Sequence, residues 1–236
     1  MKNPARFAVL MGIILLLCVS CNSTKNADSF SDEQYDYALH LVLDQTQDNA
    51  TSDLFKQFNE FNESMVPEQF YEIELRRNDI PGMDLLIREW SEEASLSILQ
   101  IYGDFTDYVE VLKSRITFRN PKALFDEGDT SVSAYYRSLY INDVAQMISK
   151  TIGTMDFKYW RQAIIQYNAW ASTRNRLYGE NNELLAAETG YDELLNIFSF
   201  HFASLFFNHL AASESLIRTT PDLSMDPLEA QILGLV

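Results

Sequence analysis

Residues Ile116–Arg137 read ITFRNPKALFDEGDTSVSAYYR, and this stretch contains the end of one helix and the start signals of two more. Asn120 can accept hydrogen bonds from the free amides of a first turn, and Pro121 has no amide that needs a partner. These two residues predict a short helical turn over Lys122–Asp126. Gly128 can adopt the left-handed conformation that ends such a turn. The stretch therefore predicts a helical corner.

The residues after Gly128 predict the start of a long helix, because Asp129, Thr130 and Ser131 offer three side-chain oxygens to its first amides. A functional interpretation is a small polar site, since a helix N-terminus presents unpaired amides and a partial positive charge. A structural interpretation is a capped corner, because a carboxylate cap stabilises a helix by ~1 kcal/mol without any ligand. Asp129 would also repel an incoming anion, so a cation or a hydroxyl-bearing ligand fits this site better than a phosphate.

Arginines are scarce in this acidic chain, so we consider them with the corner. The candidate polar site consists of Gly128, Asp129, Thr130, Arg137 and Arg218. In one interpretation, arginines pair with Asp129 or Glu214 and hold helix ends in place. In the other, Arg137 faces the corner and forms an anion pocket. We assign no catalytic residue and no metal ligand.

Several short elements of the chain resemble a known family. They are Ile116–Phe118, Gly128–Thr130, Tyr136-Arg137, Val66–Glu68, Leu75-Arg76, Leu205–Phe207, Glu214, Ile217-Arg218 and Pro221. Their order and spacing resemble a family of small helical bacterial proteins known as domain of unknown function 4197, over Ser31–Gly234. The resemblance implies an all-helical fold and no established activity. The sequence departs from the family pattern at Glu127, where a second glycine is usual, and in a longer segment between Ser172 and Thr189.

The N-terminus has the pattern of a secretory signal. Lys2 and Arg6 precede the apolar run Phe7–Leu17, which is shorter than the ~20 residues that span a bilayer. Ser20 and Cys21 suit lipoprotein processing, in which Cys21 is lipidated and becomes the first residue. The residue three positions before Cys21 is a cysteine where a leucine is more usual, so an ordinary cleaved signal is the alternative.

These features predict three regions, namely a lipoprotein signal peptide over 1–21, a flexible tether over 22–30 and a single helical domain over 31–236. Both cysteines lie in the first region, so we expect no disulfide in the helical domain. We predict a protein that is lipid-anchored in the bacterial cell envelope and faces the periplasm. Asn22 resembles a sorting signal for the outer membrane.

The charge of the chain excludes one class of function. The sequence has 34 acidic and 18 basic residues, and its net charge is −16. Such a surface repels the phosphates of nucleic acids, so we exclude nucleic-acid binding. The 47% of hydrophobic residues is sufficient for one sizeable core.

Apolar residues recur at steps of three and four, which predicts an all-α fold, a single irregular bundle of about eight to ten helices. One helix begins at the capping box of Ser31 and Gln34, and a second carries Leu54, Phe58, Phe61 and Met65. Further helices are expected over Pro67–Asn78, Leu86–Ile116 with a break near Gly103, Tyr136–Ile152, Phe157–Ala171, Tyr191–Arg218 and Leu228–Leu233. Arg174–Thr189 is expected to be a surface excursion. Tyr191–Arg218 is apolar nearly all round, which is typical of a central helix, and its polar residues argue against a membrane span.

The sequence lacks the strong catalytic signatures, such as HExxH, CxxC, a P-loop or GxSxG. His201 and His209 are eight residues apart, which is not the usual spacing of metal ligands, so we expect both to be structural. Glu92, Glu93, Asp104, Asp107 and Glu110 form an acidic group that we expect to be solvated.

Three functions are compatible with these observations, and none requires a cofactor. The first is a non-enzymatic module, tethered to the membrane by its lipid, that binds an envelope protein or a small ligand. The second is an enzyme of unrecognised type with Asp129, Thr130 and Arg137 in its site. The third is a periplasmic carrier of an apolar ligand that uses the Phe198–Phe207 helix and the Trp160–Tyr167 stripe.

Overall fold

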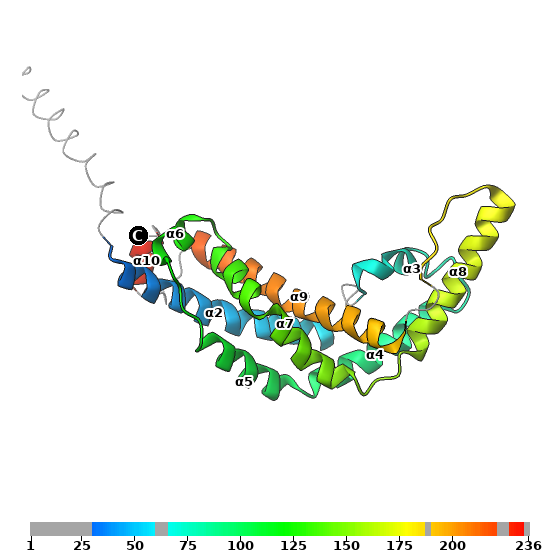
Figure 1. The fold of residues 1–236 in the computed structure, drawn as a ribbon, viewed down its shortest axis with the longest axis horizontal. Coiled ribbons are helices and arrows are strands. Elements are labelled where there is room, and N and C mark those ends of the chain that lie inside the picture. The colour runs from blue at the N-terminus through cyan, green and yellow to red at the C-terminus, as the bar shows by residue number, and fades with distance from the viewer. Residues whose placement is uncertain (1–29, 60–65, 187–189, 221–226, 234–236) are drawn as a thin grey trace, which may run out of the picture.

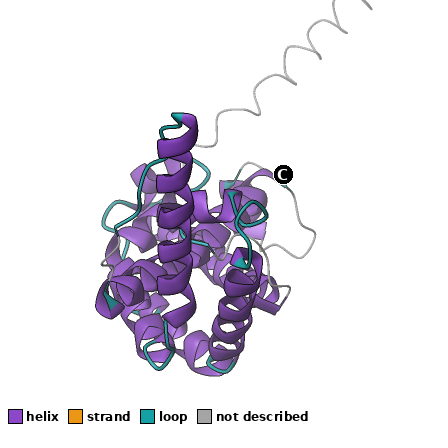
Figure 2. Ribbon diagram, turned by 90° about the vertical axis from the view of Figure 1, so that its right-hand side faces the viewer, coloured by secondary structure: helices purple, strands orange, loops and turns teal. Residues whose placement is uncertain are grey.

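The computed structural model describes residues 30–59, 66–186, 190–220 and 227–233. The predicted signal peptide, nearly all of the tether and Cys21 lie outside the described residues, as do Phe61 and Met65 of the second predicted helix. Helices and loops make up the described residues, and no strand occurs among them (Figure 2). The predicted all-α fold is therefore confirmed.

Nine α-helices and one 3₁₀ helix occur in the described ranges. In chain order they are α2 (Asp32–Asn59), the 3₁₀ helix η2 (Glu68–Phe70), α3 (Tyr71–Leu75), α4 (Met83–Leu99), α5 (Tyr102–Lys113), α6 (Pro121–Asp126), α7 (Ser131–Ile152), α8 (Lys158–Tyr178), α9 (Tyr191–Thr219) and α10 (Pro227–Ile232).

The helices form an elongated bundle around α9. Figure 1 shows α2, α7 and α9 side by side along the long axis, and α9 contacts both of the other two. The small helices α6 and α10 pack on α2 at one end, while α8 packs on α4 and α3 at the other. The predicted central helix is thus confirmed. Among the described residues α9 is also the one helix with the length and hydropathy of a membrane span.

Aromatic side chains fill the core where α4, α8 and α9 meet. The ring of Phe198 lies 4.3 Å from that of Trp90 and 5.3 Å from that of Trp160, measured between centroids. All three side chains are at most 1% exposed. Aromatic pairs of this geometry add about 0.5–1.5 kcal/mol each beyond the area they bury. The aromatic stripe of α8 therefore belongs to the core, which is the more common role of such a stripe.

Several local start signals act as the sequence predicts. At the start of α2 the main-chain amide of Ser31 donates to Gln34 Oε1 at 2.9 Å, and the amide of Gln34 donates to Ser31 Oγ at 3.3 Å. At the start of α6 the side chain of Asn120 accepts from the amide of Ala123 at 3.3 Å. Gly128 has a φ of +137°, a conformation that favours glycine. The capping box, the Asn120 cap and the role of Gly128 are confirmed.

Three predicted boundaries are wrong. The first two expected helices are one helix, α2, because Thr46 and Gln47 in its polar middle are buried and Gln47 bonds Glu110 of α5. The expected helix over Pro67–Asn78 consists of η2 and α3 only. The break before α5 falls at residues 100–101, so Gly103 lies inside α5 rather than at its boundary.

The predicted surface excursion begins later than expected, because α8 continues to Tyr178 and ends at Gly179, whose φ is +68°. The side chain of Asn175 bonds both main-chain groups of Asn182, at 2.8 and 2.9 Å. Two turns earlier, the side chain of Asn168 bonds both main-chain groups of Leu185 at 2.9 Å. These asparagines hold the segment after α8 along the helix.

Candidate functional site

The predicted corner is capped by a residue from the far end of the chain. Glu214 of α9 is fully buried, and its carboxylate accepts from the amides of Val132 at 3.1 Å and Ser133 at 2.7 Å. These amides begin α7, so the carboxylate satisfies donors that have no partner within the helix. Thr130 precedes α7 without any capping bond from its side chain. The prediction that Asp129, Thr130 and Ser131 cap this helix is therefore wrong, because Glu214 occupies that position.

Arg218 lies one turn after Glu214 and joins three parts of the corner. Its Nη2 is 2.9 Å from the Glu214 carboxylate, so the expected pairing of an arginine with Glu214 is confirmed. Its Nη1 donates to the carbonyls of Phe125 and Gly128, both at 3.1 Å. Burial lowers the pKa of Arg218, and the charge of Glu214 opposes this effect. The contacts describe a structural joint between α6, α7 and α9.

The five residues of the candidate polar site do not form one group. Gly128 and Arg218 are bonded to each other, whereas Asp129 and Thr130 are exposed to solvent. Arg137 extends from α7 toward α9 and contacts a different surface. Arg137 therefore does not lie with Asp129 and Thr130, as the predicted enzyme site at this corner requires.

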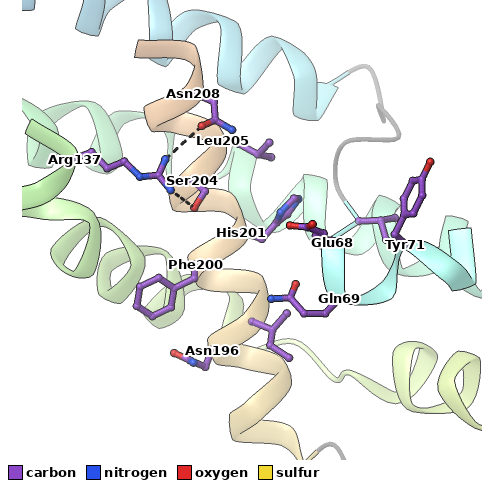
Figure 3. A pocket seen from close by; sticks show the side chains of 12 residues that line it. Glu68, Gln69, Tyr71, Arg137, Asn196, Phe200, His201, Ser204, Leu205 and Asn208 are labelled. Carbon is purple, nitrogen blue, oxygen red and sulfur yellow. Dashed lines mark hydrogen bonds between the residues drawn. The ribbon is translucent and has the colours of Figure 1, made fainter. Parts of the chain in front are cut away.

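That other surface is a groove of about 700 Å³ along the exposed side of α9. Its floor is a stripe on α9 at steps of four, formed by Asn196, Phe200, Ser204 and Asn208. Arg137 stands on one side of the stripe, while Glu68, Gln69 and Tyr71 of η2 and α3 stand on the other (Figure 3). His201 and Leu205 also line it. We call this feature the α9 groove.

A second hollow of about 290 Å³ adjoins the α9 groove. The two share Asn196 and Phe200, and the second adds Asn142 and Gln146 from α7 and Asp192 from α9. Side-chain amides and hydroxyls therefore line a long part of the α7–α9 surface. Such groups both donate and accept hydrogen bonds, so the surface suits a polar ligand.

Arg137 is positioned on the α9 groove by neutral groups. Its Nη2 donates to Ser204 Oγ at 3.1 Å, and its Nη1 lies 3.4 Å from Asn208 Oδ1. Its guanidinium carbon is 5.9 Å from the ring centre of Phe207. The guanidinium makes no ion pair with any carboxylate of the described residues. Among the described residues no carboxylate neutralises this held cation, which is therefore available to a ligand.

A third hollow, of about 460 Å³, lies between α3 and α8 at the end of the bundle. The guanidinium groups of Arg76 and Arg174 lie 5.7 and 5.9 Å from the ring centre of Trp170. Arg174 is bonded to the carboxylate of Glu180, with Nε 3.0 Å from Oε2, and Arg76 lies 3.6 Å from Asp79. The charges of this hollow are already balanced, so it is a weaker candidate than the α9 groove.

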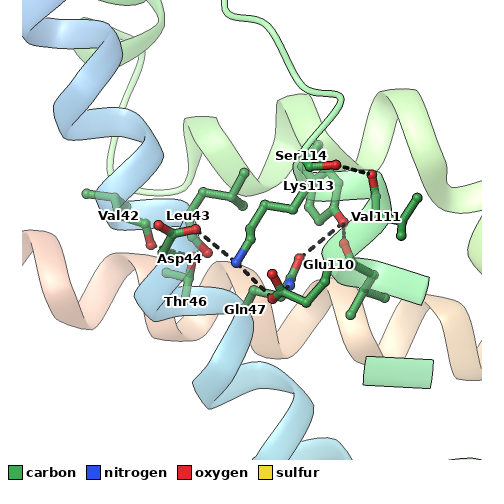
Figure 4. A network of polar contacts seen from close by, with 11 residues as sticks. Val42, Leu43, Asp44, Thr46, Gln47, Glu110, Val111, Lys113 and Ser114 are labelled. Carbon is green, nitrogen blue, oxygen red and sulfur yellow. Dashed lines mark hydrogen bonds and ion pairs between the residues drawn. The ribbon is translucent and has the colours of Figure 1, made fainter. Parts of the chain in front are cut away.

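One member of the acidic group is part of a polar network between α2, α5 and α7 (Figure 4). Lys113 Nζ lies 2.8 Å from Glu110 Oε1 and 2.9 Å from Asp44 Oδ1. Gln47, which is buried, donates to the same Glu110 oxygen and accepts from the hydroxyl of Tyr136 at 3.2 Å. Burial alone would lower the pKa of Lys113, but its two carboxylate partners raise it overall. The network links helices. Of the other acidic residues, Glu92, Asp104 and Asp107 are exposed as expected, whereas Glu93 is half-buried.

The two histidines of α9 have different surroundings. His209 Nε2 lies 2.8 Å from Gln57 Oε1, so its structural role is confirmed. His201 lines the α9 groove, with its ring 5.7 Å from that of Phe202. Within the described ranges, no three His, Cys, Asp or Glu side chains are grouped so that they could hold a metal ion.

The α9 groove was not predicted from the sequence, although part of its pattern is visible there. Asn196, Ser204 and Asn208 recur at multiples of four residues in the most apolar helix, with Phe200 between them, and a mainly polar stripe on such a helix indicates a face that stays open to solvent. Its walls come from η2 and α7, which are distant in sequence.

Comparison with known proteins adds no relative: no protein-family model, no curated protein and no solved structure matches this chain. The resemblance to domain of unknown function 4197 stays a prediction.

Proposed function

We propose that this chain is a lipid-anchored protein of the bacterial cell envelope whose helical body binds a polar ligand in the α9 groove. The lipid anchor at Cys21, the periplasmic orientation and the outer-membrane location are inferred from the N-terminal sequence. The observation that carries the binding function is the α9 groove itself, about 700 Å³ in volume and lined by amides, a hydroxyl and an arginine beside apolar side chains such as Ile197, Phe200 and Leu205. A volume of this size accommodates a small molecule or a short segment of a partner.

In this function the protein is a binding module, and no residue is assigned a catalytic role. The groove offers groups that bind and orient a ligand, and the hydroxyl of Ser204 is engaged by Arg137 rather than by a base. The apolar-carrier hypothesis has less support, because Trp160, Phe198 and Phe202 pack against one another in the core. The α9 groove is the better candidate for a ligand site.

Native mass spectrometry of the full chain, purified from membranes in mild detergent, tests this proposal. The matched variants are Ser204→Trp, which fills the α9 groove, and Ser172→Trp on the exposed side of α8. We expect an additional mass on the wild type and on Ser172→Trp, and its loss from Ser204→Trp. Circular dichroism establishes that each variant is folded. Absence of any added mass, even after incubation with a small-molecule extract of the envelope, would argue against a ligand-binding role.

A further inference from the structure

Arg137 differs from most arginines of this acidic protein in having neutral partners. Ion pairs within the described residues join Arg76 to Asp79, Arg77 to Glu74, Arg88 to Glu92, Arg161 to Asp156, Arg174 to Glu180 and Arg218 to Glu214. Arg115, Arg119 and Arg176 show no such pair, but they are exposed to solvent. Arg137 is half-buried and lines the α9 groove.

The neutral partners of Arg137 are oriented so that their own donors remain free. Ser204 Oγ accepts from Nη2 of Arg137, so its hydroxyl hydrogen points elsewhere. Asn208 faces Arg137 with its carbonyl oxygen, which leaves both hydrogens of its amide nitrogen for another acceptor. Figure 3 shows this nitrogen directed away from Arg137 and toward Leu205. Three kinds of donor, a guanidinium, a hydroxyl and an amide, therefore border one place in the groove.

Donors without a matching acceptor are the chemistry of an oxyanion site. A guanidinium presents five hydrogens in a planar fork that matches a carboxylate or a phosphate, and charge-assisted bonds of this type are stronger than neutral ones. The net charge of −16 repels anions from the protein as a whole, so an anion would need such local donors to bind. Glu68 on the opposite wall would repel a second negative group.

We infer that the ligand of the α9 groove presents a single oxyanion, a carboxylate or a phosphate, to Arg137, Ser204 and Asn208. This inference rests on the proposed binding function and specifies the chemistry of the ligand. Either group can belong to a free metabolite or to a larger molecule, and the shared feature is an oxyanion at one end. The part of the ligand next to Glu68 is expected to donate hydrogen bonds.

Thermal unfolding of the full chain in detergent tests the inference. The probe is sodium acetate or inorganic phosphate, and the reference is sodium chloride at equal ionic strength. At a probe concentration ten times its dissociation constant, we expect Tm to rise by about 3–6 °C. Arg176→Gln, an exposed arginine on α8, should keep this rise and Arg137→Gln should lose it. Arg137→Lys should give a smaller rise, because lysine keeps the charge but not the fork. A rise with acetate alone or with phosphate alone identifies which oxyanion binds.

Two outcomes would overturn the inference. One is that neither probe raises the Tm of the wild type, and the other is that Arg137→Gln retains the full rise. If native mass spectrometry finds a neutral ligand and neither anion changes the Tm, the oxyanion inference is wrong but the proposed binding function still holds. If Arg137→Gln does not fold, the rise in Tm of Arg137→Lys is compared with that of the wild type. Equal rises would contradict a bidentate arginine site.

Discussion

The carboxylate of Glu214 lies 2.7 Å from the amide nitrogen of Ser133, so a residue near the end of α9 caps the start of α7. The same carboxylate lies 2.9 Å from the guanidinium of Arg218, and both side chains are buried. Breaking a buried ion pair by removing one partner is strongly destabilising, because the other charge stays buried and uncompensated. The corner is therefore expected to be a sensitive point of the fold.

Replacement of the carboxylate tests this role. In Glu214→Gln the guanidinium of Arg218 loses its counter-ion, and one amide oxygen replaces two carboxylate oxygens at the start of α7. We expect the free energy of unfolding to fall by about 3–5 kcal/mol, measured by urea denaturation. Glu89→Gln, at an exposed position of α4, is the control and should change it by about 0.5 kcal/mol or less. Equal effects of the two changes would show that the joint is dispensable.

Two glycines provide a matched test of backbone conformation. Gly128 has a φ of +137° and Gly103 lies inside α5, and a Cβ atom at either position would meet no atom within 4 Å. Gly128→Ala should lower the free energy of unfolding by about 1–3 kcal/mol through backbone strain alone. Gly103→Ala should raise it by about 0.5–1 kcal/mol, because alanine favours a helix. Urea midpoints that move in the same direction for both variants would contradict this account.

Local rules predicted those parts of the fold whose partners are close in sequence. Ser31 bonds Gln34 and Asn120 bonds Ala123, three residues apart in each case, so the start signals could be recognised without tertiary information. The cap on Ser133 comes from Glu214, and no local spacing indicates that partner. The continuity of α2 was missed for the same reason, because polar Gln47 is buried by contacts with α5 and α7. The floor of the α9 groove is visible as a stripe, while its walls depend on tertiary packing.

The hydroxyl of Tyr136 provides a test of the polar network. It lies 3.0 Å from the carbonyl of Val109 and 3.2 Å from Gln47 Oε1, and the side chain is fully buried. Tyr136→Phe removes the single hydroxyl hydrogen that these two acceptors share, so we expect the free energy of unfolding to fall by about 1–3 kcal/mol. Tyr37→Phe, on the exposed side of α2, should have almost no effect. If Tyr136→Phe leaves the free energy of unfolding unchanged, a water molecule replaces the hydroxyl.

The proposed lipid anchor leads to a prediction about Cys21, which lies outside the described residues. Cys21→Ser removes the thiol that we propose is acylated, so we expect the protein to leave the membrane fraction. Each buried CH₂ of an acyl chain contributes about 0.8 kcal/mol, so loss of the chains abolishes stable attachment. Cys18→Leu is the control and should remain membrane-bound and acylated by mass spectrometry of the N-terminal peptide. A Cys21→Ser protein that stays in the membrane fraction would refute the anchor.

His209 leads to a prediction about pH. Burial lowers its pKa below the ordinary value of 6.5, although the charge of Asp53 acts in the opposite direction. The unfolded chain therefore takes up a proton at a higher pH than the folded chain does, and stability is lost as the pH falls through 6.5 toward the lower folded value. Above this window His209 is neutral in both states, and its Nε2 can donate to Gln57 Oε1, which is only an acceptor.

Unfolding free energies measured by urea denaturation from pH 8 to pH 5 test the sign of this effect. The wild type should lose more stability over this range than His209→Gln, which cannot take up the proton. His40→Gln, at a half-buried position of α2, is the control and should follow the wild type. If His209→Gln loses stability as steeply as the wild type, protonation of His209 does not oppose folding. The ion pairs and carboxylates elsewhere in the chain would then account for the acid sensitivity.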